Sequence, residues 1–186
     1  ISSDGLPDHT VGRFPNPGNP HKVRSQTTHV CVTATPQKGD SAQQVRTIGI
    51  ATNGVIIRPG TAEYYDPASP RGFSRDRASG WNLEGMGPEN MLGLDRNNAH
   101  VDHRGLYHYH GMPPSLADAT GTTLVGWAAD GFEIHYVGTS AKSSWMLKAG
   151  TRPTAPGGAH DGTYVEDYEF VRGAGNLDAC NGATTQ

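Results

Sequence analysis

Glycine and proline limit what this chain can fold into more than any other feature of the sequence. The 186 residues include 25 glycines and 13 prolines. Proline lacks the amide hydrogen that helices and sheets need, and glycine favours turns over regular elements. We therefore expect many turns and short elements instead of long helices. The glycine and proline content is still below that of disordered low-complexity chains, and 34% of the residues are hydrophobic, so we expect a folded core.

Short segments of β-branched and apolar residues recur along the chain, which is typical of β-strands. The Asn53-Gly54 pair between two of these segments is the strongest short signal for a hairpin. We predict a mainly β fold: a β-sandwich or a barrel-like antiparallel sheet, with long Gly/Pro-rich loops and minor helix. The predicted strand segments are 27–35, 45–51, 55–58, 106–110, 124–129, 132–137 and 164–171.

Composition divides the chain into a short arm and a larger domain. Residues 1–25 are rich in proline, glycine and asparagine, which predicts an extended N-terminal arm. Residues 26–186 are predicted to form a single β domain. The first residue, Ile1, is neither an initiator methionine nor part of a signal peptide, so we expect a processed N-terminus.

Charge and hydropathy exclude some partners. The net charge is −3 and no run of lysine or arginine stands out, which argues against a nucleic-acid groove or an anionic membrane surface. The mean hydropathy is −0.57, and no segment approaches the roughly 18 apolar residues of a membrane span. A small molecule or a glycan remains as the expected kind of partner, and the sequence does not give the oligomeric state.

The two cysteines, Cys31 and Cys180, have no Cys-x-x-Cys spacing, which disfavours a zinc knuckle or a thioredoxin-type site. Two interpretations stay open. In an oxidising compartment the cysteines would form a disulfide that closes a loop of about 150 residues. Otherwise they would be two buried free thiols.

Four of the nine histidines lie within eleven residues: His100, His103, His108 and His110. Residues i and i+2 of a strand point to one face, so His108 and His110 project together while the intervening tyrosines face the other side. A turn at Gly105 can fold His100 or His103 back to supply a third imidazole. Three histidines with an open position is the arrangement of catalytic zinc, and copper or iron also accept imidazole. We therefore predict one transition-metal ion, with zinc or copper favoured.

Five carboxylates are candidates for a fourth ligand or for hydrogen bonds to the ligands. Asp130 precedes Gly131 at the head of a predicted strand, and it is either a metal ligand or general base or an ordinary turn residue. A hydrogen-bonded network of histidines is the alternative to a metal. The full set of candidate carboxylates is Asp102, Asp130, Asp161, Glu166 and Asp167.

The motifs of serine hydrolases, nucleotide-binding enzymes and HExxH metalloproteases are missing from the sequence. Two function classes remain. One is a metal-dependent hydrolase or oxidoreductase, in which the metal activates water or, for copper or iron, handles oxygen. The other is a non-catalytic extracellular binding or structural module, in which the histidines hold a structural metal or form a polar network.

Two segments resemble the signature of the YHYH-domain proteins: Asn-Asn-Ala-His-Val at 97–101 and Gly-Leu-Tyr-His-Tyr-His-Gly at 105–111. Blocks at 49–55, 59–63, 130–132 and 162–182 extend the likeness over most of residues 10–182. The resemblance implies an exported, mostly bacterial protein of poorly defined activity, secreted or periplasmic after removal of a signal peptide. The family's histidines correspond to His100, His108 and His110. His103 lies outside the pattern and is an accessory ligand at best.

The chain departs from the family pattern at two places. Where the family reads Asp-Gly-Phe-Pro-Ile-Tyr, this chain carries Glu133 and His135. They form either an extra polar pair near the site or an altered exposed face. Family members also continue beyond the block at Cys180 with a tyrosine-rich strand and a further cysteine, whereas this chain ends at Gln186. That leaves the partner of Cys180 open and predicts an open sheet edge.

Overall fold

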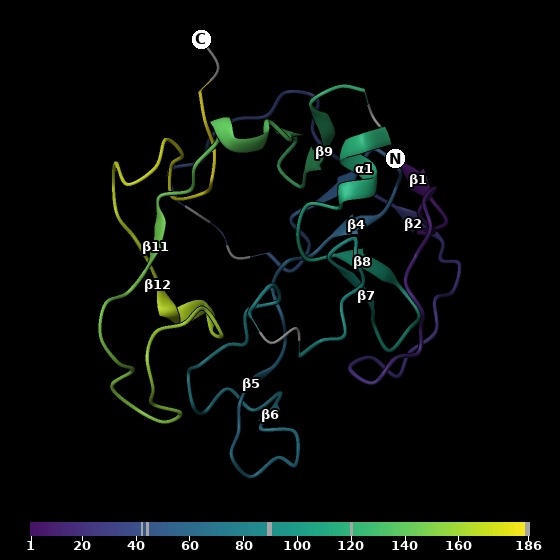
Figure 1. The fold of residues 1–186 in the computed structure, drawn as a ribbon. Helices are drawn as coiled ribbons and strands as arrows, with labels where there is room; N and C mark the ends of the chain where they lie inside the picture. The colour runs from purple at the N-terminus through teal and green to yellow at the C-terminus, as the bar shows by residue number, and fades with distance from the viewer. Residues whose placement is uncertain (42, 44, 89–90, 120, 185–186) are drawn as a thin grey trace. The chain divides into compact units, whose positions relative to one another are not determined.

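The structure is a computed structural model that describes residues 1–41, 43, 45–88, 91–119 and 121–184. Its contacts divide the chain into two compact units. Unit 1 comprises Ile1–Gly60 and Asn90–Tyr136, and unit 2 comprises Thr61–Glu89 and Val137–Gln186. Both are built from short strands joined by long loops, so the predicted mainly β class is confirmed (Figure 1). The predicted subdivision at residue 25 stays a prediction.

Unit 1 contains a six-stranded sheet in the order β10-β9-β3-β4-β8-β7. Neighbouring strands are antiparallel except for β4 and β8, which are parallel. Parallel neighbours need a long connection between them, and here about fifty residues intervene. The strands are β3 (Gly49–Ala51), β4 (Ile56–Ile57), β7 (Ala99–Val101), β8 (Tyr107–Tyr109), β9 (Leu124–Ala128) and β10 (Glu133–His135).

The predicted hairpin at Asn53-Gly54 is confirmed between β3 and β4. Gly54 has a φ of +82°, a conformation that glycine adopts without steric cost. Its amide donates to the carbonyl of Ala51 at 2.9 Å, and Ala51 donates to Val55 at 2.8 Å. The hairpin sends β4 alongside β8, so the residues that follow β4 reach the histidine-bearing strand.

The core of unit 1 packs on the face of β8 that carries Tyr107 and Tyr109, both fully buried. The Tyr107 hydroxyl donates to Asp95 at 2.8 Å, and the Tyr109 hydroxyl lies 2.6 Å from His9 Nε2. Burial raises the pKa of both tyrosines, which keeps their hydroxyls protonated. The cluster comprises Ala51, Val55, Ala99, Val101, Tyr107, Tyr109, Leu116 and Val125.

Leu116 comes from a helix that the strand patterns did not indicate, α1 (Pro114–Ala119). Two prolines, Pro113 and Pro114, follow the strand predicted at 106–110. Proline is well suited to the first position of a helix, because the amide it lacks has no partner there. Pro114 therefore both ends the extended segment and begins α1.

The first residues of the chain are hydrogen-bonded to the rest of unit 1. β1 (Ser2–Ser3) pairs with β2 (Thr28–His29), which is all that forms of the strand predicted at 27–35. The Asn19 side chain donates to the carbonyl of Val101 at 2.8 Å. The Arg24 amide donates to the carbonyl of Gly105 at 2.9 Å. These contacts attach the N-terminal segment to the hairpin of β7 and β8.

Unit 2 has two small antiparallel sheets, β5 (Tyr64–Tyr65) with β6 (Phe73–Ser74), and β11 (Trp145–Leu147) with β12 (Tyr168–Phe170). Two 3-10 turns, η1 (Gly138–Ser140) and η2 (Val165–Asp167), complete it. Of the strand predicted at 164–171, only the last part is extended, as β12. The residues before β12 form η2, and the side chain of its last residue, Asp167, accepts the amide of Tyr164 at 3.1 Å. The buried apolar side chains of unit 2 are Phe73, Trp81, Leu83 and Tyr164.

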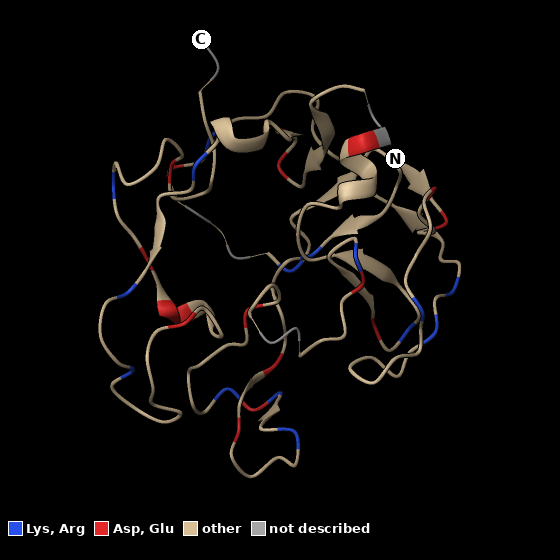
Figure 2. Ribbon diagram, viewed as in Figure 1, with Lys and Arg blue, Asp and Glu red and all other residues tan. Residues whose placement is uncertain are grey.

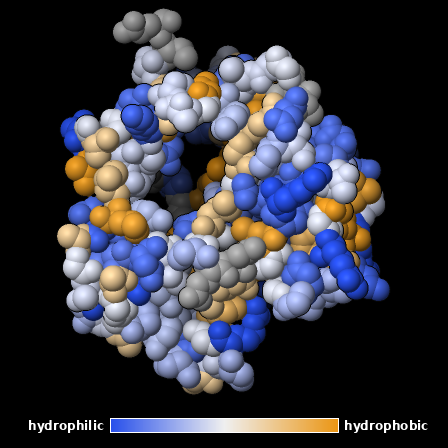
Figure 3. Space-filling model, viewed as in Figure 1, coloured by the Kyte–Doolittle hydropathy of each residue, from blue (hydrophilic) through white to orange (hydrophobic). Residues whose placement is uncertain are grey.

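Basic and acidic residues are both spread along the chain in each unit (Figure 2). The visible face of the space-filling view mixes apolar and hydrophilic residues (Figure 3). Within the described residues, no helix is long and apolar enough to cross a membrane. Cys31 and Cys180 are exposed free thiols. The expectation that free cysteines would be buried is therefore wrong, and the disulfide stays a prediction.

Candidate metal centre

The hairpin of β7 and β8 sets His100 directly opposite His108. Its turn is organised by Asp102, whose Oδ1 accepts the amides of Arg104 at 2.8 Å and Leu106 at 3.1 Å. Gly105 has a φ of +90° in this turn, where a side chain would be strained. The turn therefore fixes the register that places the two histidines side by side.

His110 follows β8 and joins the other two histidines, as the two-residue spacing predicted. Its amide donates to the carbonyl of Asn98 at 2.7 Å, and Asn98 itself has a φ of +55°. The ring centroids lie 4.6 Å apart for His100–His108, 4.6 Å for His100–His110 and 4.9 Å for His108–His110. One ligand atom from each ring lies within 4.8 Å of the other two. The structure thus brings the three family histidines together.

Backbone carbonyls orient all three rings. Nδ1 of His100 lies 3.0 Å from the carbonyl of Leu92, Nδ1 of His108 lies 3.2 Å from that of Leu106, and Nδ1 of His110 lies 2.8 Å from that of Pro59. A carbonyl oxygen only accepts, so the proton of each neutral ring sits on Nδ1 and the lone pair on Nε2. Hydrogen bonds of this kind commonly orient metal-binding histidines.

Burial keeps the three rings neutral. His108 is 1% exposed and His110 is 5% exposed. Burial lowers the pKa of His108 to about 2, and the nearby charge of Arg58 lowers it further in the same direction. Burial also lowers the pKa of His110 to about 4 and lowers that of His100. Metals bind imidazole in its neutral form, so these rings need no deprotonation at neutral pH.

The nitrogen separation fits a metal better than it fits a hydrogen bond. Nε2 of His108 lies 3.2 Å from Nε2 of His110. With both protons on Nδ1, two lone pairs face each other across this gap and repel. Two nitrogens at the usual 2.0–2.1 Å from a tetrahedral zinc are roughly 3.3–3.4 Å apart. The donor set therefore fits a transition metal.

Arg58 lies against the histidine group. Its Nη2 is 3.3 Å from Nδ1 and 3.2 Å from Nε2 of His108. Such similar distances place Nη2 over the ring face, because in the ring plane it would collide with the carbon between the nitrogens. The same Nη2 forms an ion pair with Oδ2 of Asp102 at 3.2 Å. Arg58 therefore brings positive charge to the site without occupying the Nε2 lone pair.

Other predicted residues lie outside the group of ligand atoms. His103 is exposed in the turn between β7 and β8, and Asp130 is exposed in the turn between β9 and β10. Two strands, β3 and β4, separate β9 from β8 in the sheet order. Glu133 and His135 pair with each other at 2.8 Å on β10, with both side chains exposed, so they alter an outer face.

Three of the candidate carboxylates belong to unit 2. Asp161 and Asp167 form ion pairs with Arg152, and Glu166 accepts the amide of Asn82 at 2.7 Å. Among the candidate carboxylates, Asp102 is the one that pairs with Arg58, which in turn contacts His108. Burial would raise the pKa of Asp102, but hydrogen bonds from Arg104, Leu106 and Arg58 outweigh this and lower it.

The sequence patterns missed Arg58 and the orienting carbonyls. Arg58 ended a predicted strand with no sign that it would meet a histidine fifty positions later. The one sequence signal was the block at 59–63, whose first residue, Pro59, supplies the carbonyl for His110. That block matched the family pattern, but its contact depends on the parallel pairing of β4 with β8.

Comparison with known proteins gives one match. A sequence model of the family described as YHYH protein matches residues 29–186, which include all three histidines of the site. No curated protein matches the chain, and no solved structure does.

Proposed function

This chain belongs to the YHYH protein family, and on that premise we propose that it binds one transition-metal ion through His100, His108 and His110. One observation carries the proposal: each Nδ1 is taken by a backbone carbonyl. One ligand atom from each ring lies within 4.8 Å of the other two, and Nε2 of His108 lies 3.2 Å from Nε2 of His110. A cation between these atoms would relieve the repulsion between their lone pairs.

Imidazole ligands suit zinc and copper best among the common metals. Bound at this site, either ion would supply Lewis-acid activation of water or, for copper, oxygen chemistry. The chain would then act as a metal-dependent hydrolase or oxidoreductase. The backbone carbonyls hold the rings in place, and Arg58 favours negative charge beside them. Export to the periplasm or the medium, as the family resemblance implies, belongs to the same proposal.

Metal analysis of the purified protein tests the proposal directly. The wild type should carry close to one zinc or copper per chain after loading and desalting. The His108→Ala/His110→Ala variant should carry almost none. The matched control is His103→Ala, which removes an exposed histidine from the adjacent turn and should leave the metal content unchanged. Equal metal content in all three proteins would overturn the proposal.

A non-catalytic module with a structural metal is the second candidate, favoured by the low exposure of His108 and His110. Structural zinc sites are closed by four protein ligands, whereas catalytic sites keep an open position. Cobalt-loaded protein distinguishes the two through its visible spectrum. A spectrum that changes on adding azide indicates an open position and favours an enzyme. A spectrum that does not change favours the structural role.

A further inference from the structure

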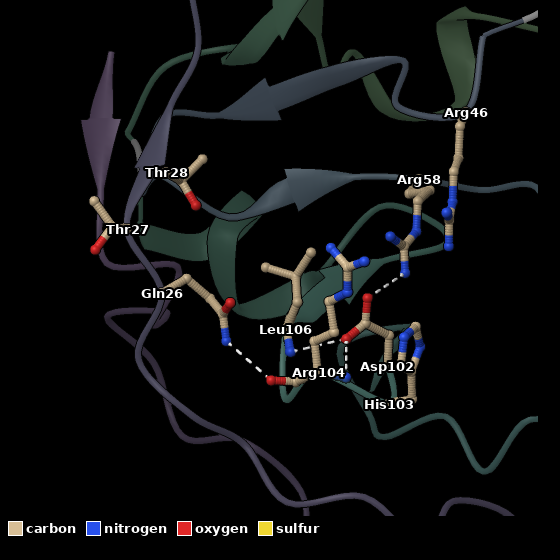
Figure 4. Close-up of a pocket in the computed structure, with 9 residues that line it drawn as sticks. All are labelled: Gln26, Thr27, Thr28, Arg46, Arg58, Asp102, His103, Arg104 and Leu106. Carbon is tan, nitrogen blue, oxygen red and sulfur yellow. Dashed lines mark hydrogen bonds and ion pairs between the residues drawn. The ribbon is translucent and has the colours of Figure 1, made fainter.

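A second site in unit 1 lies beside the histidines, in a pocket between the segment before β3, the end of β4, β2 and the β7–β8 turn (Figure 4). Three arginines line it: Arg46, Arg58 and Arg104. They come from three separate parts of the sequence, so the sequence alone gave no sign of the cluster. Figure 4 shows their side chains entering the same region of the pocket.

The pocket has more positive than negative charge. Asp102 is the only carboxylate that lines it. Its Oδ2 binds Arg58, and its Oδ1 accepts the two turn amides. Within the described part of the chain, Arg46 and Arg104 form no ion pair. Among the described residues, the guanidinium groups of Arg46 and Arg104 therefore have no carboxylate partner.

The guanidinium groups of Arg46, Arg58 and Arg104 face the same pocket (Figure 4). Holding like charges together is unfavourable unless an anion joins them. Arg46 and Arg104 are exposed, whereas Arg58 is only 9% exposed. An anion could thus enter between the two outer arginines and reach the inner one.

The remaining lining includes the neutral residues Thr27, Thr28 and Gln26. The Gln26 amide is already engaged, because its nitrogen donates to the carbonyls of Arg24 at 2.9 Å and Arg104 at 3.5 Å. Guanidinium groups match the oxygens of phosphate and carboxylate in geometry, often through two parallel hydrogen bonds. The lining therefore suits a small oxyanion group.

We propose that this pocket binds the phosphate or carboxylate group of a small anionic ligand. Arg58 connects the pocket to the histidines, because its Nη2 is 3.2 Å from both Asp102 Oδ2 and His108 Nε2. An oxyanion held by Arg58 would lie on the side of Arg58 that faces away from the histidines, one side chain removed from His108. Binding of the anion does not depend on a metal. Its role as the anchor for the substrate of the metal site rests on the function proposed above.

Calorimetric titration with inorganic phosphate and, separately, with acetate tests the proposal on chelator-treated and on zinc-loaded protein. Ionic strength is held constant with chloride. The variants are Arg46→Gln and Arg104→Gln, both at exposed positions. The control is Arg13→Gln, which removes an exposed arginine of the same unit that does not line the pocket. Zinc content is measured on every sample.

We expect chelator-treated wild type to bind at least one of the two anions. Each pocket variant should bind roughly tenfold more weakly, since each loses a charge-assisted hydrogen bond, and Arg13→Gln should bind like wild type. All variants should keep their zinc. The proposed anion site would be overturned by any of three results: no binding of either anion, equal affinity in all variants, or binding only by zinc-loaded protein. Loss of zinc binding in the wild type would overturn the metal proposal instead.

Discussion

Each unit buries a cluster of polar side chains. The two clusters differ in whether every charged or hydrogen-bonding group has a partner within the protein. In unit 2, Arg152 meets Asp167 at two points, Nε to Oδ1 at 2.8 Å and Nη2 to Oδ2 at 2.6 Å. Asp167 is fully buried and also accepts from His160 and from the amides of Gly162 and Tyr164. Its charge is balanced inside the protein.

In unit 1, backbone carbonyls provide a hydrogen-bond partner for only one of the two ring nitrogens of each histidine in the cluster. The Nδ1 atoms of His100, His108 and His110 have carbonyl partners, whereas Nε2 of His108 faces Nε2 of His110 at 3.2 Å. A cluster whose charges and hydrogen bonds close on themselves stabilises the fold. A cluster of nitrogen lone pairs without partners is suited to bind a metal cation from solution. The following predictions test this difference.

The largest effect is expected from Asp167→Asn in unit 2. The substitution removes the buried counter-charge of Arg152 and leaves it only its ion pair with the half-exposed Asp161. Breaking a buried pair by removing one partner typically costs about 3–5 kcal/mol. Urea denaturation of the variant and the wild type measures the loss, and metal analysis should find the zinc content unchanged. A loss below about 1 kcal/mol would mean that the cluster is not structural.

Zinc should stabilise the protein through unit 1. A ligand that binds only the folded state adds about 2.7 kcal/mol when its free concentration is a hundred times Kd. Urea denaturation with and without buffered zinc measures this increment. Asp167→Asn should retain the full increment, whereas His108→Ala/His110→Ala should lose it. If the histidine variant gains as much stability from zinc as the wild type, zinc binds elsewhere.

Acid should affect the two clusters in different pH ranges. Burial lowers the pKa of His108 and His110 to about 2 and about 4, and unfolded histidine has a pKa of about 6.5. A lowered pKa gives stability that is present above the unfolded value and lost as pH falls. Metal-free protein should therefore lose about 2 kcal/mol for each of these histidines between pH 7 and pH 5.

Asp167 should contribute at lower pH. Burial would raise its pKa, but hydrogen bonds from Arg152 and the backbone outweigh this and lower it. Its stability is therefore lost only below about pH 4. Urea denaturation of metal-free wild type and Asp167→Asn from pH 7 to pH 3 separates the two ranges. Constant stability between pH 7 and pH 5 would show that the histidines are not buried as described.

The smallest effect is expected from the exposed pair on β10. Glu133→Gln removes the partner of His135, and both side chains are more than a third exposed. Surface pairs of this kind contribute at most about 1 kcal/mol. Urea denaturation should detect little change, and zinc content should stay the same. A larger loss would mean that polar pairs in this protein matter irrespective of burial.

Local sequence patterns were sufficient for two of the three histidines. The two-residue spacing of His108 and His110 predicted their common face, whereas the Gly105 turn left His100 and His103 as alternatives and the family resemblance selected His100. The hairpin at Asn53-Gly54 was equally local. In each of these cases the relevant residues lie within about a dozen positions of one another, where strand periodicity and turn chemistry decide the geometry.

Contacts between distant segments were not predictable. Arg58 meets His108 because β4 runs parallel to β8, a pairing that no local pattern encodes. Asp130 was a candidate because a carboxylate before a strand can reach a metal, but the sheet order places β3 and β4 between its hairpin and β8. The sequence identifies the ligand types, and the topology decides which side chains surround them.

Anomalous diffraction from crystals of the zinc- or copper-loaded protein tests the central claim most directly. Data collected on both sides of the metal's absorption edge locate the ion and identify its element. We predict a single strong peak per chain, bonded to the Nε2 atoms of His100, His108 and His110. A loaded crystal with no peak there, or with its strongest peak bound to other residues, would contradict the account.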